Sequence, residues 1–300
     1  MGPDRQLSCT AGFLQQRRSM KRLFLLIWIG LSCAAGIRAQ ERLDVYARRY
    51  LGQPYVERAL EVIPERLVVD TASVDCMTLV EYCLARRIAD AKVQGAAAEK
   101  PASKGHGTSF ADCVGMLRYR DYEPGQKLQY SDRLHYATEW VAQAEAKGWV
   151  KDLSGELGER TQRTINFMSS HTASYQQLAG NGQQAREDLR IIKDEVEPRL
   201  SARPFTYIPK AKIKEIEREI QDGDIIFFTT STDGLDVSHM AIACIQPPQG
   251  PDPGTAARRM KVGFIHASQT AGKVVIDPMS IAEYAQSRRS ITGIKVVRPL

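Results

Sequence analysis

Cysteine and histidine are scarce in this 300-residue chain, which holds six of the first and five of the second. No pair of them stands at the short spacing of zinc ligands, so we expect no metal site and no cofactor. No tandem repeat is visible, and the marked apolar run at residues 23–29 is too short to span a bilayer. These absences leave a globular domain of about 260 residues after a leader is removed.

The chain after residue 39 also lacks an excess of basic residues. Residues 1–39 contain six of the 41 basic and one of the 35 acidic side chains, which leaves 35 basic against 34 acidic residues. The net charge of +6 therefore belongs mostly to the leader. The remaining chain gives no reason to expect nucleic-acid binding.

The N-terminus has the pattern of a secretory signal. Lys21 and Arg22 precede the apolar run, and Ala39 offers a small residue at the cleavage position. We expect residues 1–39 to be an extension plus signal peptide, with Met20 as a second candidate start. The mature chain is then periplasmic and keeps no membrane span. Lipidation at Cys33 is disfavoured, because Leu31 lies one position away from its place in a lipoprotein signal.

Cys76 is the first candidate catalytic residue. Asp75 suits a helix N-cap, Thr78 falls in the first turn, and apolar residues then recur at helical spacing, which predicts a helix from about Cys76. A thiol at this position feels the positive end of the helix dipole, so we expect its pKa to fall. Cys76 is therefore a candidate nucleophile.

Two histidines complete the candidate site. His239 opens the apolar strand pattern 239–245 and is the candidate base, while His266 lies in a second apolar pattern at 263–267. His266 is placed to orient the ring of His239, as the third member of a catalytic triad does. A single cysteine or histidine in such a context is more often structural, so the prediction rests on the three together.

The predicted fold is α+β, with residues 40–300 as one domain. A helical N-terminal part and the Cys76 helix precede a long, mostly helical insertion at about 90–220, and a C-terminal antiparallel sheet follows. Apolar spacing predicts insertion helices near 134–144 and 213–220. The expected strands are residues 224–229, 239–245, 261–267, 273–277 and 291–297. We expect Cys83 and Cys244 to be core residues. The sequence does not decide whether Cys113 forms a disulfide.

The insertion gathers cationic, aromatic and amide side chains that could bind a sugar and peptide carboxylates. Each could equally be a surface charge or a packing residue. The candidates are Arg118, Tyr119, Arg120, Tyr130, Ser131, Asp132, Arg133, His135 and Asn166.

The motifs, taken in order, resemble those of the NlpC-type papain-like cell-wall hydrolases. They are Gly52-Gln-Pro-Tyr55, Val74-Asp-Cys76, Asp222-Gly-Asp224, His239-Met-Ala-Ile242 and Ile265-His-Ala-Ser268. The resemblance covers roughly residues 45–300 and implies a papain-like fold. It also implies roles for Cys76 as nucleophile, His239 as base, His266 as orienting residue and Tyr55 as a residue lining the site.

One departure from the common endopeptidase pattern narrows the resemblance. Those enzymes read Asp-Cys-Ser-Gly, whereas this chain has Met77 and Thr78 after the cysteine. This variant and the segment Gly234-Leu-Asp-Val-Ser-His239 make the chain similar to one branch of these hydrolases, which was long filed as a domain of unknown function. Within that segment, Asp236 and Ser238 are expected to contact the substrate. Members of that branch resemble N-acetylmuramoyl-L-alanine amidases, which implies action on muropeptides. We also expect the protein to be a monomer.

Two other functions remain open at this point. The first is a murein endopeptidase that cuts between D-glutamate and the diamino acid with the same three residues. The second is a non-catalytic peptidoglycan-binding protein, which the intact set of Cys76, His239 and His266 disfavours.

Overall fold

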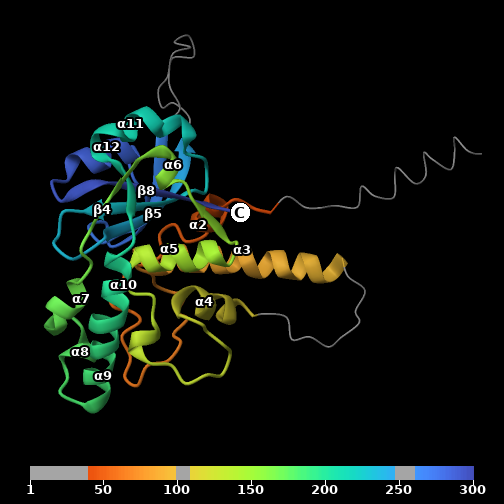
Figure 1. The fold of residues 1–300 in the computed structure, drawn as a ribbon. Coiled ribbons are helices and arrows are strands. Elements are labelled where there is room, and N and C mark those ends of the chain that lie inside the picture. Colours follow the sequence, from red (N-terminus) through yellow and green to blue (C-terminus); the bar gives the residue numbers. More distant parts are fainter. Residues whose placement is uncertain (1–39, 99–108, 247–260) are drawn as a thin grey trace, which may run out of the picture. The chain divides into compact units, whose positions relative to one another are not determined.

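An antiparallel sheet of eight strands forms the centre of the computed structural model, which describes residues 40–98, 109–246 and 261–300 (Figure 1). Its order is β2-β3-β8-β4-β5-β6-β7, and β1 also pairs with β8. The strands are β1 (Val150–Asp152), β2 (Glu159–Thr161), β3 (Phe205–Pro209), β4 (Ile225–Thr230), β5 (Val237–Gln246), β6 (Lys261–Ser268), β7 (Lys273–Ile276) and β8 (Ile291–Pro299). The five C-terminal strands are those predicted from the sequence, with ends that differ by at most two residues.

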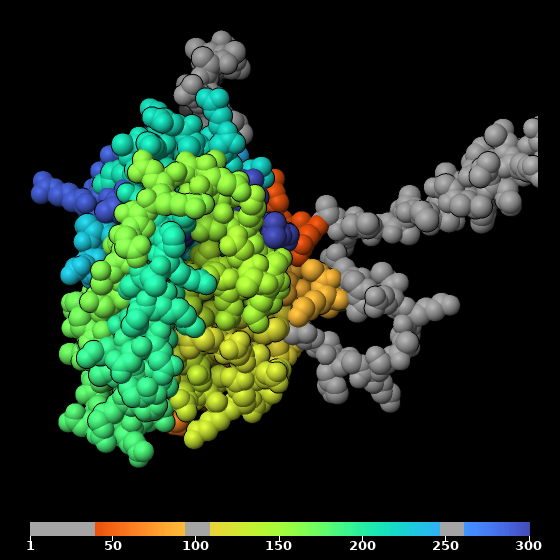
Figure 2. All heavy atoms as spheres, in the orientation of Figure 1, coloured from red at the N-terminus to blue at the C-terminus, as the bar shows by residue number. Residues whose placement is uncertain are grey.

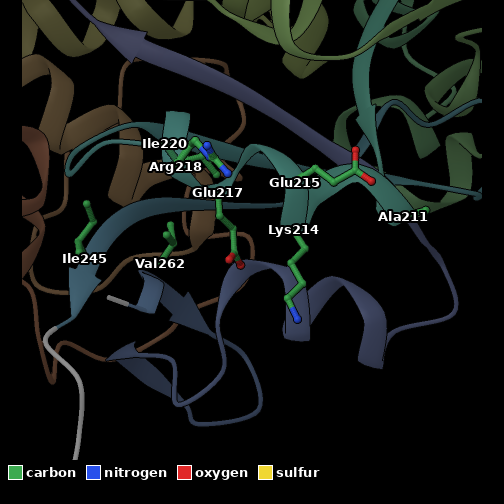
Figure 3. Close-up of a pocket in the computed structure, with 8 residues that line it drawn as sticks. All are labelled: Ala211, Lys214, Glu215, Glu217, Arg218, Ile220, Ile245 and Val262. Atoms are coloured by element: carbon green, nitrogen blue, oxygen red, sulfur yellow. The ribbon is translucent and has the colours of Figure 1, made fainter. Parts of the chain in front are cut away.

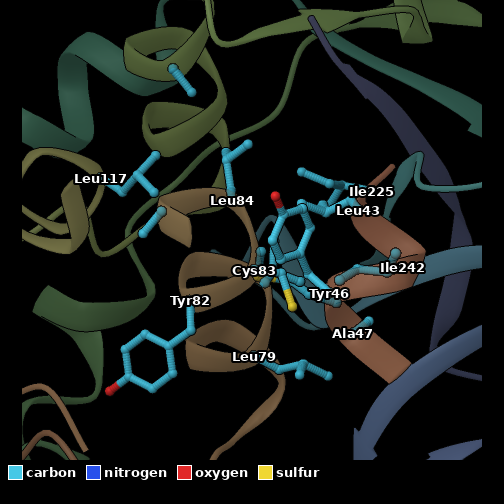
Figure 4. Close-up of a cluster of buried hydrophobic side chains, with 14 of the residues drawn as sticks. Leu43, Tyr46, Ala47, Leu79, Tyr82, Cys83, Leu84, Leu117, Ile225 and Ile242 are labelled. Atoms are coloured by element: carbon cyan, nitrogen blue, oxygen red, sulfur yellow. The ribbon is translucent and has the colours of Figure 1, made fainter. Parts of the chain in front are cut away.

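Side-chain alternation along the strands builds two separate cores. In β4, Ile225 and Phe227 belong to the core on one face, and Ile226 and Phe228 belong to the core on the other. This is the period of two that a sheet buried on both faces requires. Figure 4 shows the first core, where β4 and β5 meet α2 (Leu43–Arg48) and α3 (Cys76–Ala98). The second core contains side chains of α11 (Ile213–Ile216) and α12 (Ile281–Ser287).

The start of α3 is fixed by a reciprocal cap. Asp75 Oδ1 accepts a hydrogen bond from the backbone N–H of Thr78 at 2.7 Å, and the Asp75 N–H donates to Thr78 Oγ1 at 2.8 Å. These bonds satisfy N–H groups that a helix start leaves without partners. The predicted helix start at Cys76 is confirmed.

The insertion between α3 and β4 is made of short helices and three strands. Its α-helices are α4 (Phe110–Arg118), α5 (Ala137–Ala146), α6 (Ser154–Leu157), α7 (Phe167–Ser170), α8 (Gln176–Ala179), α9 (Gln183–Ile191), α10 (Glu197–Ser201) and α11. Single turns of other helix types lie at Tyr130–Asp132, Thr172–Ser174, Ile192–Val196, Lys210–Lys212 and Glu217–Glu219. Figure 1 shows α7 to α10 gathered to one side of the sheet, and Figure 2 shows this segment beside the yellow residues of α4 on the same face.

Two expectations for the insertion need correction. Strands β1, β2 and β3 extend the sheet from within a segment that was expected to be mostly helical. The helix expected near 213–220 ends at Ile216 and continues only as a 3₁₀ turn. Three isoleucines at helical spacing could mark that helix, but only tertiary packing decides how far it extends.

The expectations for the cysteines can be compared with the structure, whereas those for the N-terminal leader cannot. Cys76, Cys83, Cys113 and Cys244 are free thiols, and the last three are buried, so Cys113 forms no disulfide with the other described cysteines. The signal peptide and Cys33 lie outside the described residues. Within the described ranges, none of the helices has the length and apolar character needed to cross a membrane.

Candidate active site

Cys76 and His239 line the same small cavity, whose volume is about 170 Å³. The thiol comes from the first residue of α3, and the imidazole comes from β5. The rest of the wall comes from the start of α5 and from the segment that leads into β5. The other lining residues are Met77, His135, Ala137, Trp140, Leu235, Asp236, Val237, Ser238 and Met240.

A β-bulge lies immediately before His239. Phe228 of β4 pairs with His239, but the next residue, Thr229, pairs with Val237, so Ser238 is the extra residue. A bulge bends the strand and re-aims the side chains beside it, and such bulges are frequent next to active sites. The ring of His239 is stacked against Phe228 and Tyr284, with centroids 5.8 and 6.0 Å away.

The two predicted histidines are in direct contact. His239 Nε2 lies 2.7 Å from His266 Nδ1, with the rings nearly perpendicular. Strand register explains the contact: Ile242 of β5 pairs with Ile265 of β6, which makes His239 and His266 diagonal neighbours on adjacent strands. The sequence prediction that His266 contacts His239 is therefore confirmed as geometry.

A carboxylate that the sequence analysis missed extends this chain of contacts. Asp277 Oδ2 lies 3.2 Å from His266 Nε2, at ion-pair distance, although the N–H is not aligned for a hydrogen bond. Asp277 is the diagonal neighbour of His266, because His266 pairs with Val275 of β7. Its other oxygen accepts from the Met279 N–H at 2.8 Å, and the side chain is buried.

The contacts favour one arrangement of protons on the two imidazole rings. An ionised Asp277 only accepts hydrogen bonds, so it favours a proton on His266 Nε2. His266 Nδ1 is then an acceptor, and His239 Nε2 must donate to it. The proton-free Nδ1 of His239 remains, and this is the atom that could take a proton from a thiol. Asp277 thus influences the site through two histidines.

Burial dominates the ionisation of these groups. Burial and the nearby Asp75 raise the pKa of the Cys76 thiol to about 12, although backbone hydrogen bonds from Met240, Cys76 and Met77 act in the opposite direction. Burial and the neighbouring His266 lower the pKa of His239 to about 3, and burial lowers that of His266 to about 4. The expectation that the helix dipole lowers the thiol pKa is wrong for this resting state, since desolvation outweighs it.

Four of the predicted substrate-binding residues are at this site. His135, Asp236 and Ser238 line the cavity itself. Tyr55 pairs with Val74, two residues before Cys76, and burial followed by the nearby Cys76 raises the pKa of Tyr55 to about 12. Asp236 is held by the start of α5: its Oδ2 accepts from the Thr138 N–H at 2.7 Å and from Thr138 Oγ1 at 2.8 Å.

The structure does not bring the other predicted substrate contacts to the cavity. Arg133 is buried and makes paired hydrogen bonds of 2.7 and 2.8 Å to Glu65, so its guanidinium already has a carboxylate. Tyr130 packs in a helical core, and the Ser131 N–H donates to Asp188. Asn166 is exposed at the start of α7.

The expected cationic groups are likewise committed inside the protein. Arg118 is buried and donates to Glu81 at 2.7 and 2.9 Å, and Arg120 donates to Glu139 at 2.9 and 3.1 Å. Sequence cannot separate such ion pairs from substrate contacts, because the partners lie up to 68 positions away along the chain. No group of three or more metal-binding side chains occurs within the described ranges.

A wider cavity of about 860 Å³ lies elsewhere, between α11 and the strands β5 and β6 (Figure 3). Its wall contains Lys214, Glu217 and Arg218 together with Ile245 and Val262. None of these residues is a cysteine or a histidine. The larger cavity is therefore not the candidate active site, because only the smaller cavity at Cys76 contains a potential nucleophile and a base.

Comparison with known proteins decides the family. The family model described as AmiA-like, N-acetylmuramoyl-L-alanine amidase-like, matches residues 45–294. The chain belongs to this AmiA-like family. No curated protein matches the chain.

Solved structures agree with the AmiA-like assignment. An N-acetylmuramoyl-L-alanine amidase from Bacteroides uniformis is similar at 33% identity and a TM-score of 0.69, over 86% of this chain and 98% of that one. A Bacteroides fragilis protein provisionally named a xylanase is 30% identical with a TM-score of 0.67, over 85% and 99%. A Legionella pneumophila protein, 18% identical with a TM-score of 0.55 over 86% and 88%, shares the fold. The matched family region contains Cys76, His239, His266 and Asp277.

Proposed function

We propose that this AmiA-like protein is a cysteine-dependent N-acetylmuramoyl-L-alanine amidase with a papain-like fold of the NlpC superfamily. The observation that carries the proposal is the cavity shared by Cys76 and His239, with His266 directly behind the histidine. The substrate is peptidoglycan or its muropeptide fragments. The leader pattern at residues 1–39 supports export to the periplasm, and the protein acts there as a monomer without a cofactor.

The reaction begins from neutral partners. His239 Nδ1 removes the thiol proton as Cys76 Sγ attacks the lactyl carbonyl carbon, and the carbonyl electrons move to oxygen. N–H groups at the start of α3 favour that developing negative charge. The tetrahedral species then collapses, the C–N bond breaks, and the amine of L-alanine takes the proton from His239.

Water completes the cycle. His239, neutral again, removes a proton from water, whose oxygen attacks the thioester carbon, and the C–S bond breaks to release the free acid and the thiol. His266 holds the His239 ring in the required tautomer, and Asp277 does the same for His266. Tyr55 is placed near Cys76 by its bridge to Val74, and Asp236 and Ser238 line the cavity.

Product analysis tests this assignment against the endopeptidase alternative. The mature protein is incubated with defined muropeptides, and the products are weighed by mass spectrometry, with Cys76→Ala as the control. An amidase releases the intact sugar and a peptide that begins with L-alanine. A sugar that retains L-alanyl-D-glutamate would instead identify an endopeptidase. Absence of turnover together with a thiol that stays inert to iodoacetamide even at alkaline pH would support a non-catalytic binding protein.

A further inference from the structure

Helix α12 lies against the two candidate catalytic histidines. The ring of Tyr284 is stacked on that of His239, with centroids 6.0 Å apart, and it meets the ring of His266 edge-on at 5.8 Å. Tyr284 is buried, and it also packs against Phe228 and Phe264, with centroids 4.8 and 5.0 Å away. These are the separations at which aromatic rings attract one another. The two imidazoles therefore share one aromatic wall, and α12 supplies it.

A cation rests on the ring of Tyr284. The guanidinium carbon of Arg288 lies 3.4 Å from the ring centroid. Neighbouring groups fix its position: Arg288 Nη1 donates to Ser287 Oγ at 2.9 Å, and Ser287 Oγ donates to the backbone carbonyl of Tyr284 at 2.8 Å. The backbone carbonyl of Arg288 accepts from Lys210 Nζ at 2.7 Å. These contacts hold the guanidinium against the ring that both histidines touch.

The charge of Arg288 has no carboxylate partner among the described residues. In this respect it differs from Arg118, Arg120 and Arg133, each of which makes an ion pair with a glutamate. Arginine stays ionised in proteins, and the face of an aromatic ring attracts a cation without cancelling its charge. Arg288 is half-buried, so water screens this charge less than it would at a fully exposed position. Its field therefore reaches the groups packed beneath it.

Both imidazoles are among those groups. Burial, then His266 and then Arg288 lower the pKa of His239. For His266, burial lowers the pKa, Asp277 raises it and Arg288 lowers it again. The titratable groups that line the cavity or contact the pair are Cys76, His135, Asp236, Asp277 and Tyr284. None of these five is a permanent cation, so Arg288 supplies the positive charge that acts on both rings.

Resting on the proposed amidase function, we propose that Tyr284 and Arg288 are positioning residues of the catalytic site. The ring of Tyr284 holds the two imidazoles, and the charge of Arg288 on that ring favours their neutral forms. Neutral His239 is the form that can take the proton of Cys76, so the base stays available in acidic solution. Once His239 has taken that proton, the same charge makes the imidazolium a stronger acid toward the leaving amine.

Nitrogen-15 NMR of the histidine side chains tests the effect of the charge without turnover. The mature protein is titrated as Cys76→Ala, alone and combined with Arg288→Gln, which removes the charge and leaves a planar amide over the ring. We expect the protonation midpoint of His239 to move to higher pH by roughly 0.5 to 1 pH unit, the effect of one nearby charge. Arg288→Lys keeps the charge and should stay close to the parent. Arg289→Gln removes the same charge from the exposed neighbouring residue and should leave the midpoint unchanged.

Kinetics with intact Cys76 give a second measurement. The acidic limb of kcat/KM against pH, measured on N-acetylmuramoyl-L-alanyl-D-glutamate, reports protonation of the free enzyme's base. Arg288→Gln should move this limb to higher pH by the same amount as the NMR midpoint, with little change in KM at neutral pH. Tyr284→Leu should lower kcat by roughly tenfold, because it removes the surface that holds both imidazoles. Tyr284→Phe, which keeps the ring, should recover most of that loss.

Three results would overturn the proposal. The same midpoint in Arg288→Gln as in Arg289→Gln would show that the charge does not act on the histidines. A higher KM with an unmoved acidic limb would make Arg288 a contact for a substrate carboxylate instead. A loss of kcat that is equal at every pH in Arg288→Gln, together with a lower melting temperature, would reduce α12 to a packing role. Absence of turnover in the wild type would refute the amidase function itself, and the NMR midpoints would still decide whether Arg288 acts on the histidines.

Discussion

At the scale of single residues, the prediction with the simplest outcome concerns Cys76. Cys76→Ala should abolish release of peptide from muropeptides while the melting temperature stays close to wild type. Alanine is a strong helix former, and the reciprocal bonds of Asp75 and Thr78 that cap α3 do not involve the thiol. Product release is followed by mass spectrometry and folding by circular dichroism. Turnover near wild type would remove Cys76 from the mechanism.

The series of contacts from His239 through His266 to Asp277 predicts losses of kcat that become smaller with distance from Cys76. His239→Ala should lower kcat by roughly 10²- to 10⁴-fold, because both proton transfers use this ring. His266→Gln should cost less, and Asp277→Asn less again, since each acts through its neighbour at 2.7 and 3.2 Å. The three variants are compared by kcat at saturating substrate. A larger loss for His266→Gln than for His239→Ala would reverse the assigned roles.

The protonation state of the thiol gives an independent residue-scale prediction. Burial raises the pKa of Cys76 to about 12, so the resting enzyme holds a neutral thiol and a neutral imidazole. Alkylation of Cys76 by iodoacetamide should then be slow at pH 7 and rise about tenfold per pH unit toward alkaline pH. Cys76→Ala serves as the blank for other thiols. A rate plateau that begins below pH 7 would demonstrate a preformed thiolate.

At the scale of elements, the sequence predicted what local pattern controls and missed what distant contacts control. The cap at Asp75, the start of α3 and the five C-terminal strands all leave local signatures. Asp277 is the last residue of the strand predicted at 273–277. Its contact with His266 depends on the register between β6 and β7, which local sequence does not reveal. Arg133 was expected to contact substrate because it is a cation in the insertion, and its partner Glu65 lies in a distant segment that local sequence does not reveal.

The ion pair that joins α3 to α4 tests whether such arginines are structural. Arg118 and Glu81 are both buried, and burial raises the Glu81 pKa despite the cation. Glu81→Ala should destabilise the protein by about 3–5 kcal/mol in denaturant unfolding, because it leaves a buried charge alone. The double variant Glu81→Leu with Arg118→Met should lose much less. If Arg118→Met raised KM without loss of stability, the substrate-binding interpretation would be right for this residue.

At the scale of the whole molecule, the insertion does more than enlarge the domain. It supplies β1, β2 and β3 to the sheet, and it supplies α5, which contributes Ala137 and Trp140 to the wall of the cavity. Asp236 ties the segment before β5 to the start of α5 through two hydrogen bonds from Thr138. The insertion and the sheet are therefore connected at the point where the candidate base is held. This connection makes the site sensitive to global stability.

Global stability should depend on acid through three histidines whose pKa values are lowered in the fold. His135, His239 and His266 are neutral in the fold, with pKa values lowered to about 3, 3 and 4, whereas an unfolded chain binds protons at about 6.5. Unfolding below pH 6.5 therefore takes up protons, and stability falls with pH until the folded pKa is reached. Buried Asp236, whose pKa is raised, acts in the opposite direction at lower pH, so a difference measurement is needed.

The comparison of wild type with His135→Gln isolates one of these histidines. Wild type takes up one more proton on unfolding between about pH 6 and pH 4, so its free energy of unfolding should fall relative to the variant by roughly 1.4 kcal/mol per pH unit. Other titrating groups are common to both proteins and cancel in the difference. Urea unfolding at half-unit steps of pH measures the slope. A difference independent of pH would mean that His135 is protonated in the folded protein across this pH range, and that burial does not lower its pKa.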